Sequence, residues 1–505
     1  MQVVTAKEMY EIDRYAMEVA GIDGKILMEN AGRSIASRAV TLIDGSQPIL
    51  VLVGSGNNGG DGFVIARTLL NQGFDIFVAQ LVPDHKIKGD AAYHRQLYIN
   101  FGGVIQRVQG AEELKPFLEK SAVVVDAILG IGFSGELRSP LKQMISVVNE
   151  CSALKLSVDI PSGIPADEGL PFSTGFNADY TFVIEHPKPS TFLIDCNPFY
   201  GVWEIVKIGL PFTMFEKRND CNVWEDKNVR STLPRRSDYS HKGNHGKGLI
   251  IGGCLEMPGS VTMTALAALR SGAGLLTVGT VREAIPSIAS NCVEATFHSI
   301  ASREGYITGR PLINLSPYDA IAIGMGMGRS NDTALFTRSV LENADIPVLV
   351  DADGLYHIKG DLSLLAKRQN TTVLTPHPGE MAMLMDCTVS EILAKPFEVS
   401  KSFACTYGVF LVLKGVFTII TDPKGNQWIN TTGNAGLAKG GSGDVLSGVI
   451  LTLMMQNKTT HEALANGVFI HGKAAEAMVS HQHSSYDLLA TDVINGLSSV
   501  FRTLI

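Results

Sequence analysis

The stretch GNAGLAKGGSGD, from Gly433 to Asp444, runs directly into the apolar segment VLSGVI at 445–450 and decides the fold around it. Apolar residues recur with helical spacing through this segment, so we predict that a helix begins at the end of the glycine run 440–443. A helix N-terminus leaves backbone N–H groups without partners, and glycines let those groups close around phosphate oxygens. The stretch therefore predicts an anion site of the kind that holds a phosphate group.

Asp444 stands at the edge of this predicted anion site, where its carboxylate would repel a bound phosphate. Such a position makes chemical sense if Asp444 removes a proton from a hydroxyl group that attacks the phosphate. The alternative is an ordinary acidic residue in the first helical turn, where the helix dipole favours a negative charge. Because the glycine run precedes it, we prefer the catalytic interpretation.

Size and composition set the frame for the rest of the chain. A length of 505 residues is too long for one core, and about 100–200 residues per domain predicts roughly two to four domains. A hydrophobic content of 45% with 18% charged residues is typical of a well-packed soluble protein. The net charge of -8 and the pI near 5.9, with scattered Lys and Arg, argue against nucleic-acid binding.

The sequence also predicts a cellular location. The 7 cysteines are widely spaced and form no C-x-x-C pair, which is typical of reduced thiols in a cytoplasmic protein. The sequence after Met1 has no basic stretch followed by an apolar one, and no apolar run reaches ~18 residues. We therefore expect neither secretion nor a membrane partner.

The first half contains a second glycine-rich stretch. A predicted strand at 49–53 leads into GSGNNGGDG at 54–62, which satisfies the G-x-G-x-x-G pattern before a helix predicted from 63. The next strand, at 76–80, lacks the final acidic residue that binds a ribose in dehydrogenases, and the loop is unusually polar. We therefore prefer a different ligand site to a standard dinucleotide site, and a plain tight turn is the alternative.

Two further predicted strands of the first half end in carboxylates. The runs 122–126 and 156–160 place Asp126 and Asp159 near their carboxyl ends, and parallel sheets bind ligands beyond those ends. Each Asp alone is more often a cap or turn residue, but two of them beside a loop of Asn and Asp favour a site. Oxygen ligands of this kind suit a hard cation such as potassium or magnesium rather than zinc.

The second half repeats this arrangement after a polar, irregular join, and we place the domain boundary near 215–225. Predicted strands near 318–328, 347–354, 372–380 and 409–413 lead to one sheet edge. His377 lies between prolines that hold its turn rigid, which favours a functional role over an ordinary loop histidine. The residues expected at that edge are Gly326, Asp353, His377, Glu380, Lys414 and Asp444.

These motifs, in this order, resemble the family of bifunctional NAD(P)H-hydrate repair enzymes over essentially the whole chain. The motifs that resemble its epimerase domain are NNGGDG at 57–62, VDA at 125–127 and DIPSG at 159–163. Those that resemble its ADP/ATP-dependent dehydratase domain are SHKG at 240–243, DAD at 351–353, HPGE at 377–380 and the stretch 432–444. The resemblance implies an α/β fold, with a Rossmann-like three-layer αβα domain at 1–215 and a ribokinase-like αβα domain at 225–505.

The resemblance also implies the site residues of the first domain. A potassium ion would be held by Asn58, Asp126 and Ser162. The hydrated nicotinamide nucleotide would contact Asn57, Asn58, Gly59, Gly60, Asp61, Gly130, Ile131, Gly132, Phe133, Ser134, Gly135, Glu136 and Asp159. We choose Asp159 as the acid or base of epimerisation, because Asp126 is assigned to the cation.

In the second domain, the resemblance implies that Gly326, His377 and Asp444 contact the hydrate. ADP or ATP, with Mg²⁺, would be bound by Lys414, Gly415, Val416, Phe417, Thr418, Asn434, Gly440, Gly441, Ser442 and Gly443. Asp444 would be the catalytic base for phosphorylation of the ring hydroxyl, and loss of phosphate would restore NADH or NADPH. The first domain would interconvert the R and S hydrates, and the second would dehydrate the S form.

Two other functions stay open at this point. One is a ribokinase-like small-metabolite kinase with an added nucleotide-binding domain, because a glycine run followed by Asp before a helix also fits a kinase. The other is a non-enzymatic first half that senses nucleotides or binds protein. We also expect a homo-oligomer and small-molecule substrates only.

Overall fold

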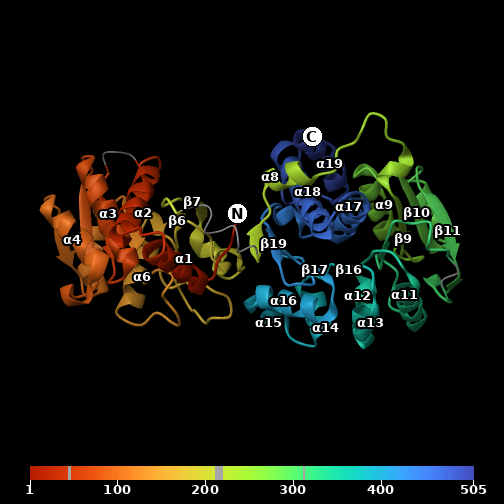
Figure 1. Ribbon diagram of the computed structural model, residues 1–505, viewed down its shortest axis with the longest axis horizontal. Helices are drawn as coiled ribbons and strands as arrows, with labels where there is room; N and C mark the ends of the chain where they lie inside the picture. Colours follow the sequence, from red (N-terminus) through yellow and green to blue (C-terminus); the bar gives the residue numbers. More distant parts are fainter. Residues whose placement is uncertain (44–46, 211–219, 311–312) are drawn as a thin grey trace. The chain divides into compact units, whose positions relative to one another are not determined.

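The computed structural model describes residues 1–43, 47–210, 220–310 and 313–505 (Figure 1). The chain forms two compact units, one of residues Gln2–Asn219 and the other of Asp220–Ile505 together with Met1. Residue 215, where the first domain is expected to end, lies outside the described residues, so the boundaries 1–215 and 225–505 stay a prediction. Within the described parts of the chain, no helix is long and apolar enough to cross a membrane.

The first unit is built on a seven-stranded sheet in the order β3-β2-β1-β4-β5-β6-β7, with every neighbouring pair parallel. Its strands are β1 (Ile49–Val53), β2 (Ile76–Gln80), β3 (Ile105–Arg107), β4 (Val123–Ala127), β5 (Leu154–Val158), β6 (Tyr180–Ile184) and β7 (Val202–Val206). The strand order reverses between β1 and β4, and a ligand crevice is expected beyond the carboxyl ends of that pair. The glycine turn after β1 and Asp126 of β4 both lie there.

Helices cover both faces of this sheet. They are α1 (Ala6–Glu18), α2 (Gly24–Ala39), α3 (Asn57–Asn71), α4 (Gly89–Asn100), α5 (Ala111–Leu118), α6 (Leu141–Glu150) and α7 (Asn197–Tyr200). Successive side chains of β1 point to opposite faces of the sheet. Ile49, Val51 and Val53 pack in the core that includes residues of α2, α3 and α4. Leu50 and Leu52 pack in the core that includes residues of α5 and α6, so the continuous apolar run of β1 reflects burial on both sides.

One predicted boundary in the first unit is wrong. The glycine loop was expected to extend to Gly62, but α3 already begins at Asn57. The glycines inside α3 are there for close packing: a Cβ on Gly59 would lie 2.3 Å from the Gly54 carbonyl oxygen, and a Cβ on Gly62 would lie 2.6 Å from the Ala127 side chain. Because no side chain intervenes, the N-terminus of α3 sits directly at the crevice.

The second unit contains a ten-stranded sheet in the order β11-β10-β9-β14-β15-β16-β17-β18-β19-β8. The run from β11 to β17 is parallel, and the hairpin β17-β18-β19 is antiparallel. The strands are β8 (Cys221–Val223), β9 (Lys247–Ile251), β10 (Leu275–Val281), β11 (Thr296–Ile300), β14 (Ala320–Ile323), β15 (Val348–Val350), β16 (Thr372–Leu374), β17 (Phe410–Leu413), β18 (Thr418–Thr421) and β19 (Gln427–Asn430), with a separate pair β12 (Ser302–Arg303) and β13 (Tyr306–Ile307). The predicted parallel strands leading to one edge are confirmed.

Figure 1 shows α9, α17, α18 and α19 on one side of this sheet and α11 to α16 on the other. The helices are α8 (Asp226–Thr232), α9 (Pro258–Arg270), α10 (Ile285–Ala289), α11 (Asn331–Asn343), α12 (Asp353–Ile358), α13 (Ser363–Lys367), α14 (Pro378–Met385), α15 (Val389–Ala394), α16 (Pro396–Tyr407), α17 (Ser442–Gln456), α18 (Thr460–His481) and α19 (Ala490–Leu504). The predicted αβα layering is thus confirmed in both units.

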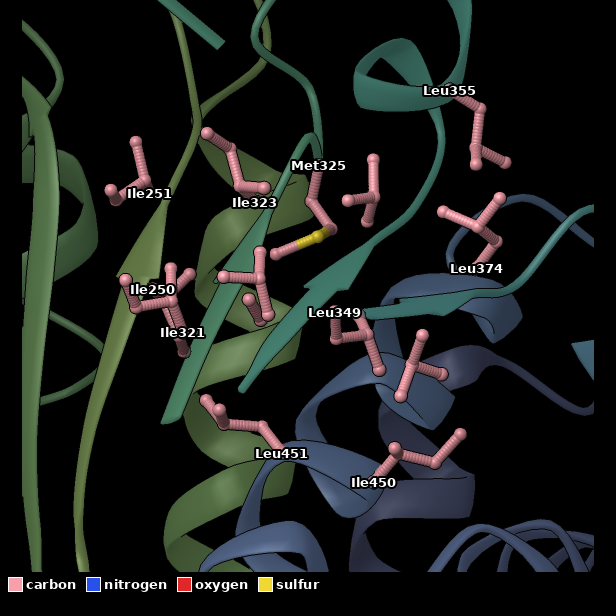
Figure 2. Packing of buried hydrophobic residues seen from close by; sticks show 14 of the residues in the cluster. Ile250, Ile251, Ile321, Ile323, Met325, Leu349, Leu355, Leu374, Ile450 and Leu451 are labelled. Atoms are coloured by element: carbon pink, nitrogen blue, oxygen red, sulfur yellow. The ribbon is translucent and has the colours of Figure 1, made fainter. Parts of the chain in front are cut away.

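Helix α17, which follows the glycine run, is held firmly against the sheet. Figure 2 shows Ile450 and Leu451 of α17 beneath the strands that carry Ile321 and Leu349, all in one buried cluster. On its other flank α17 crosses α9 closely at Gly448, where a Cβ would lie 2.2 Å from the Thr264 carbonyl oxygen. This packing fixes the N-terminus of α17 at the carboxyl edge of the sheet.

Candidate active sites

The first candidate site is a cavity of about 650 Å³ at the β1–β4 crevice of the first unit. The predicted residues that line it are Asn57, Asn58, Asp61, Gly130, Ile131, Gly132, Phe133, Ser134 and Asp159. Gly59, Gly60, Gly135 and Glu136 are not among the lining residues. Gly59 and Gly60 lie inside α3, where they pack against the Gly54 carbonyl and Met28.

Asp159 is held in a defined conformation in the wall of this cavity. It follows β5 in a left-handed backbone conformation, with φ of 65°, which is uncommon for a residue other than glycine. Its Oδ1 accepts hydrogen bonds from Lys188 Nζ at 2.5 Å and from the Ile184 N–H at 3.1 Å. The Lys188 side chain is only 1% exposed, so Asp159 and Lys188 form a buried ion pair in the cavity wall.

Asp126 lies behind this wall and makes a compact cluster with Ser162 and Asn58. Asp126 accepts hydrogen bonds from the Ser162 N–H at 2.7 Å and the Ser162 hydroxyl at 2.6 Å. Asn58 donates through Nδ2 to the Leu129 carbonyl, and the Leu129 N–H donates to Ser162 Oγ. Burial raises the pKa of Asp126 to about 6, although the hydrogen bonds from Ser162 oppose the shift. The three residues predicted to bind a cation are thus brought together.

Several residues that line the first cavity were not predicted from the sequence, among them Tyr10, Asp13 and Lys188. Tyr10 and Asp13 reach it from α1, and Lys188 follows β6. Lys188 carried a usable signal, because it stands between Pro187 and Pro189 after a strand, the pattern that singled out His377. Tyr10 and Asp13 carried none, since an amphipathic helix does not reveal which element its polar side will face.

The second candidate site lies at the carboxyl edge of the second sheet, where Lys414 is surrounded by carboxylates. Lys414 Nζ lies 2.9 Å from Asp351 Oδ1 and 3.7 Å from Glu380 Oε2. Asp351 also accepts a hydrogen bond of 2.7 Å from the Ser447 hydroxyl of α17. Burial lowers the pKa of Lys414, but the charges of Asp351 and Glu380 outweigh it and leave the pKa raised. Lys414 therefore stays a cation.

Asp444, in the first turn of α17, faces the same group of charges. Burial and the negative charge of Asp351 raise the pKa of Asp444 to about 7, against a lowering by the Ser260 hydroxyl bound to it and by Lys414. Ser260 in turn touches the glycine loop after β14, because a Cβ on Gly326 would lie 2.8 Å from its Cβ. Gly326 and Asp444 are thus linked through Ser260, which was not among the predicted site residues.

The glycine run and Lys414 also meet. A Cβ on Gly443 would lie 3.4 Å from Lys414 Nζ, so a glycine there leaves the ammonium group open toward the helix N-terminus. Gly441 is the N-cap of α17, with φ of 93°, which suits glycine. Residues 414–417 form the turn between β17 and β18, and Thr418 begins β18. Backbone N–H groups and one ammonium group therefore converge where an anion can bind.

Two further predicted residues, His377 and Asn434, have identifiable local roles. His377 caps α14, since its Nδ1 accepts from the N–H groups of Gly379 and Glu380 at 3.0 and 3.2 Å. Its Nε2 is then the protonated nitrogen of the neutral ring, and the side chain is 57% exposed. Asn434 accepts a hydrogen bond from the Gly436 N–H at 3.0 Å and so shapes the start of the glycine run. His377 can therefore donate to a ligand.

Two family models match separate parts of the chain. Residues 24–190 match the family described as YjeF-related protein N-terminus, and residues 248–497 match the family described as NAD(P)H-hydrate dehydratase. A crystal structure of an ADP/ATP-dependent NAD(P)H-hydrate dehydratase from Bacillus subtilis, co-crystallised with ATP and Mg²⁺, is 35% identical, covers 56% of this chain and 99% of that one, and has a TM-score of 0.49.

Two curated relatives match almost end to end, and both are named bifunctional NAD(P)H-hydrate repair enzyme Nnr. The protein from Moorella thermoacetica is 34% identical, over 100% of this chain and 97% of its own. The protein from Escherichia coli is 32% identical, over 97% of this chain and 92% of its own. The predicted resemblance is confirmed, and the chain belongs to the family of bifunctional NAD(P)H-hydrate repair enzymes.

Proposed function

We propose that the first unit epimerises the R and S forms of hydrated NADH and NADPH, and that the second dehydrates the S form with ADP or ATP as phosphoryl donor. The observation that carries the proposal is the position of Asp444 in the first turn of α17, beside Lys414, where burial and the charge of Asp351 raise the pKa of its carboxyl group to about 7. That is the arrangement needed to activate a hydroxyl group against a bound phosphate.

The proposed dehydration has two steps in the second site. Asp444 takes the proton of the ring hydroxyl, whose oxygen attacks the terminal phosphoryl group while the N–H groups of 440–443 and Lys414 stabilise the oxygens. The phosphorylated oxygen then leaves as phosphate, and loss of a proton from the neighbouring ring carbon restores the double bond. With ADP as donor, the products are AMP, phosphate and NADH or NADPH. Ser260, which binds the Asp444 carboxyl group, orients the base.

Mg²⁺ would bind in this site together with the phosphates of the nucleotide. It binds mostly to phosphate oxygens and water, with one or two carboxylates from the protein. Glu380, at the edge of the Lys414 cluster, can supply one such oxygen. When bound, the ion neutralises charge that develops on the phosphates.

For the first site we propose a potassium ion held by Asn58, Asp126 and Ser162. The donor set fits, because all three side chains offer oxygen and Asn58 Oδ1 accepts no hydrogen bond from the described residues. Asp126 is 0% exposed and has no cationic side chain within ion-pair distance among the described residues. A bound cation would compensate this buried charge. Asp159 would then be free to act as the acid or base of epimerisation.

The test of the proposed function is product analysis on the full chain. NADH hydrate, Mg²⁺ and either ADP or ATP are expected to give reduced nicotinamide, detected by its absorbance, together with free phosphate. A stable phosphorylated product in their place would identify the alternative, a small-metabolite kinase. The R/S ratio, followed by chromatography without nucleotide, tests the first unit. The homo-oligomer and the cytoplasmic location stay predictions.

The dehydration rate is expected to rise with pH because Asp444 must be deprotonated to act as base. With a pKa of about 7, the ionised fraction grows about tenfold between pH 6 and pH 8, so kcat/KM should rise by about that factor and then level off. The measurement is dehydration of S hydrate under saturating nucleotide. A rate that stays flat from pH 6 to pH 8 would contradict the assignment.

Epimerisation is expected to depend on potassium. Replacing KCl by choline chloride at constant ionic strength should slow the wild-type reaction, whereas Asp126→Asn, which keeps the shape and removes the charge, should be slow in both salts and bind hydrate weakly. Circular dichroism checks that the variant is folded. Equal wild-type rates in the two salts would count against the cation site.

A further inference from the structure

Helix α1 lies outside the residue ranges that the two family models match. It is nevertheless held beside the first cavity by several hydrogen bonds. The segment before it joins the Lys188 region, since the Val4 N–H donates to the Pro187 carbonyl at 3.1 Å and the Gln2 carbonyl lies 3.2 Å from His186 Nδ1. At the helix start, the Ala6 N–H donates to Asp167 Oδ1 at 3.0 Å. The position of α1 relative to Lys188 is therefore fixed by several bonds.

One side of α1 faces the cavity. Tyr10, Asp13 and Met17 have helical spacing and line it together with the buried Met9, whereas Ile12 and Ala16 are buried and do not line it. The Tyr10 hydroxyl would lie 2.6 Å from a Cβ on Gly132, so α1 closes directly onto the loop after β4. This contact sets Asp13, one turn further along, in the cavity wall.

Asp13 lies in that wall without a structural partner among the described residues and without a role in the proposed reaction. Unlike Asp159, it makes no hydrogen bond or ion pair with any residue that the structure describes. Partial burial of an unpaired carboxyl group costs folding free energy, so its presence in the wall suggests a function. We propose that Asp13 is a second catalytic residue of the epimerase, the acid that protonates the ring hydroxyl while Asp159 acts as base; this rests on the epimerase function proposed above.

The chemistry requires two such groups. Hydration of the dihydronicotinamide ring places the hydroxyl on a carbon bonded to the ring nitrogen. Asp13 gives its proton to the hydroxyl oxygen, the C–O bond breaks with its electron pair on the departing water, and the nitrogen lone pair forms a C=N bond. The ring carbon is then planar and open from both faces.

The second half of the reaction inverts the centre. A water on the opposite face adds its oxygen to the carbon and gives a proton to Asp159, while the C=N electrons return to nitrogen. In sum, one proton has moved from Asp13 to Asp159 and the hydroxyl has changed face, so the reverse direction uses the same groups with roles exchanged. Exchange with solvent resets them.

The charges around the cavity are consistent with Asp13 as the acid and Asp159 as the base. Burial raises the pKa of Asp13 to about 6, with Lys188 opposing the shift and Asp159 and Glu185 adding to it. A part of Asp13 is therefore protonated near neutral pH. Asp159 is held in place by its ion pair with Lys188. The same cavity thus offers an acid and a base from different elements.

The test compares Asp13→Asn, Asp13→Glu and Glu18→Gln in the full chain. Glu18 is an exposed carboxylate at the end of the same helix and outside the cavity, so Glu18→Gln is the matched control. We expect Asp13→Asn to lower the kcat of epimerisation by roughly 10²–10⁴-fold with KM within about threefold, Asp13→Glu to recover part of it, and Glu18→Gln to match wild type. Unchanged dehydration of S hydrate shows that the chain is intact.

Solvent labelled with ¹⁸O supplies the second readout. Each inversion by wild type should bring one solvent oxygen into the hydroxyl, and Asp13→Asn should slow labelling and inversion together. An Asp13→Asn rate within threefold of wild type, a change in KM alone, or inversion with retained oxygen would each overturn the role of Asp13. A wild-type protein that does not change the R/S ratio would instead refute the epimerase function itself.

Discussion

Asp444→Asn is expected to lower the dehydration rate by roughly two to four orders of magnitude, the usual loss when a general base is removed. The substitution keeps the shape of the side chain and removes the charge that takes the proton. Affinity for ADP should be unchanged or higher, because the carboxylate repels phosphate. Epimerisation should be untouched, since its residues belong to a different sheet.

Both activities are measured on the same protein, recovery of reduced nicotinamide by absorbance and R-to-S conversion by chromatography. Glu342→Gln, on an exposed part of α11, is the matched control for a lost carboxylate in the same unit. If Asp444→Asn retains dehydration within a few-fold of wild type, Asp444 is not the base. If both activities disappear together, the assignment of two separate sites is wrong.

Lys188→Met is expected to destabilise the first unit by about 3 kcal/mol, because it leaves the Asp159 carboxylate without its buried partner. Methionine replaces the apolar stem of the lysine, so the lost charge dominates the effect. Since 1.36 kcal/mol is a factor of ten, amides of β5 and β6 should exchange about a hundredfold faster in hydrogen-exchange measurements. Epimerisation should fall as well, because Asp159 loses the group that orients it.

The double variant Lys188→Met, Asp159→Asn is the control for this prediction. Removing both charges should recover part of the lost stability, because the remaining amide has no charge to bury, but it should not recover epimerisation. Hydrogen exchange is preferred to bulk denaturation, since two units need not unfold together. Additive losses in the double variant would show that the pair contributes nothing as a pair.

The sequence predicted those features that depend on local order along the chain. The apolar run of β1 and the glycines before α17 carry their own signals, because strand burial and helix starts are set by nearby residues. Parallel strands place their carboxyl ends together, so the order of strands and loops was enough to expect Lys414 and Asp444 at one edge.

Other features could not be predicted from the sequence, because they depend on contacts that only the folded structure shows. Gly59 and Gly62 resembled loop residues, and only the contacts with Gly54 and Ala127 show that they are helical residues packed too closely for a side chain. Ser260 reaches Asp444 because α9 and α17 lie side by side, a contact between segments far apart in sequence. Asp13 faces the first cavity for the same kind of reason.

The close crossing of α9 and α17 limits how this enzyme can be engineered for heat resistance. Replacing helical glycines by alanine is a common route to thermostable variants, with gains of about 0.4–1 kcal/mol where the backbone allows it. Gly448 is unsuited to that strategy despite its helical backbone, because the added methyl group would push α17 off α9. Because the helix is rigid, the displacement would also move its first turn, which carries Asp444. A Gly448→Ala variant selected for heat resistance would therefore lose catalytic rate.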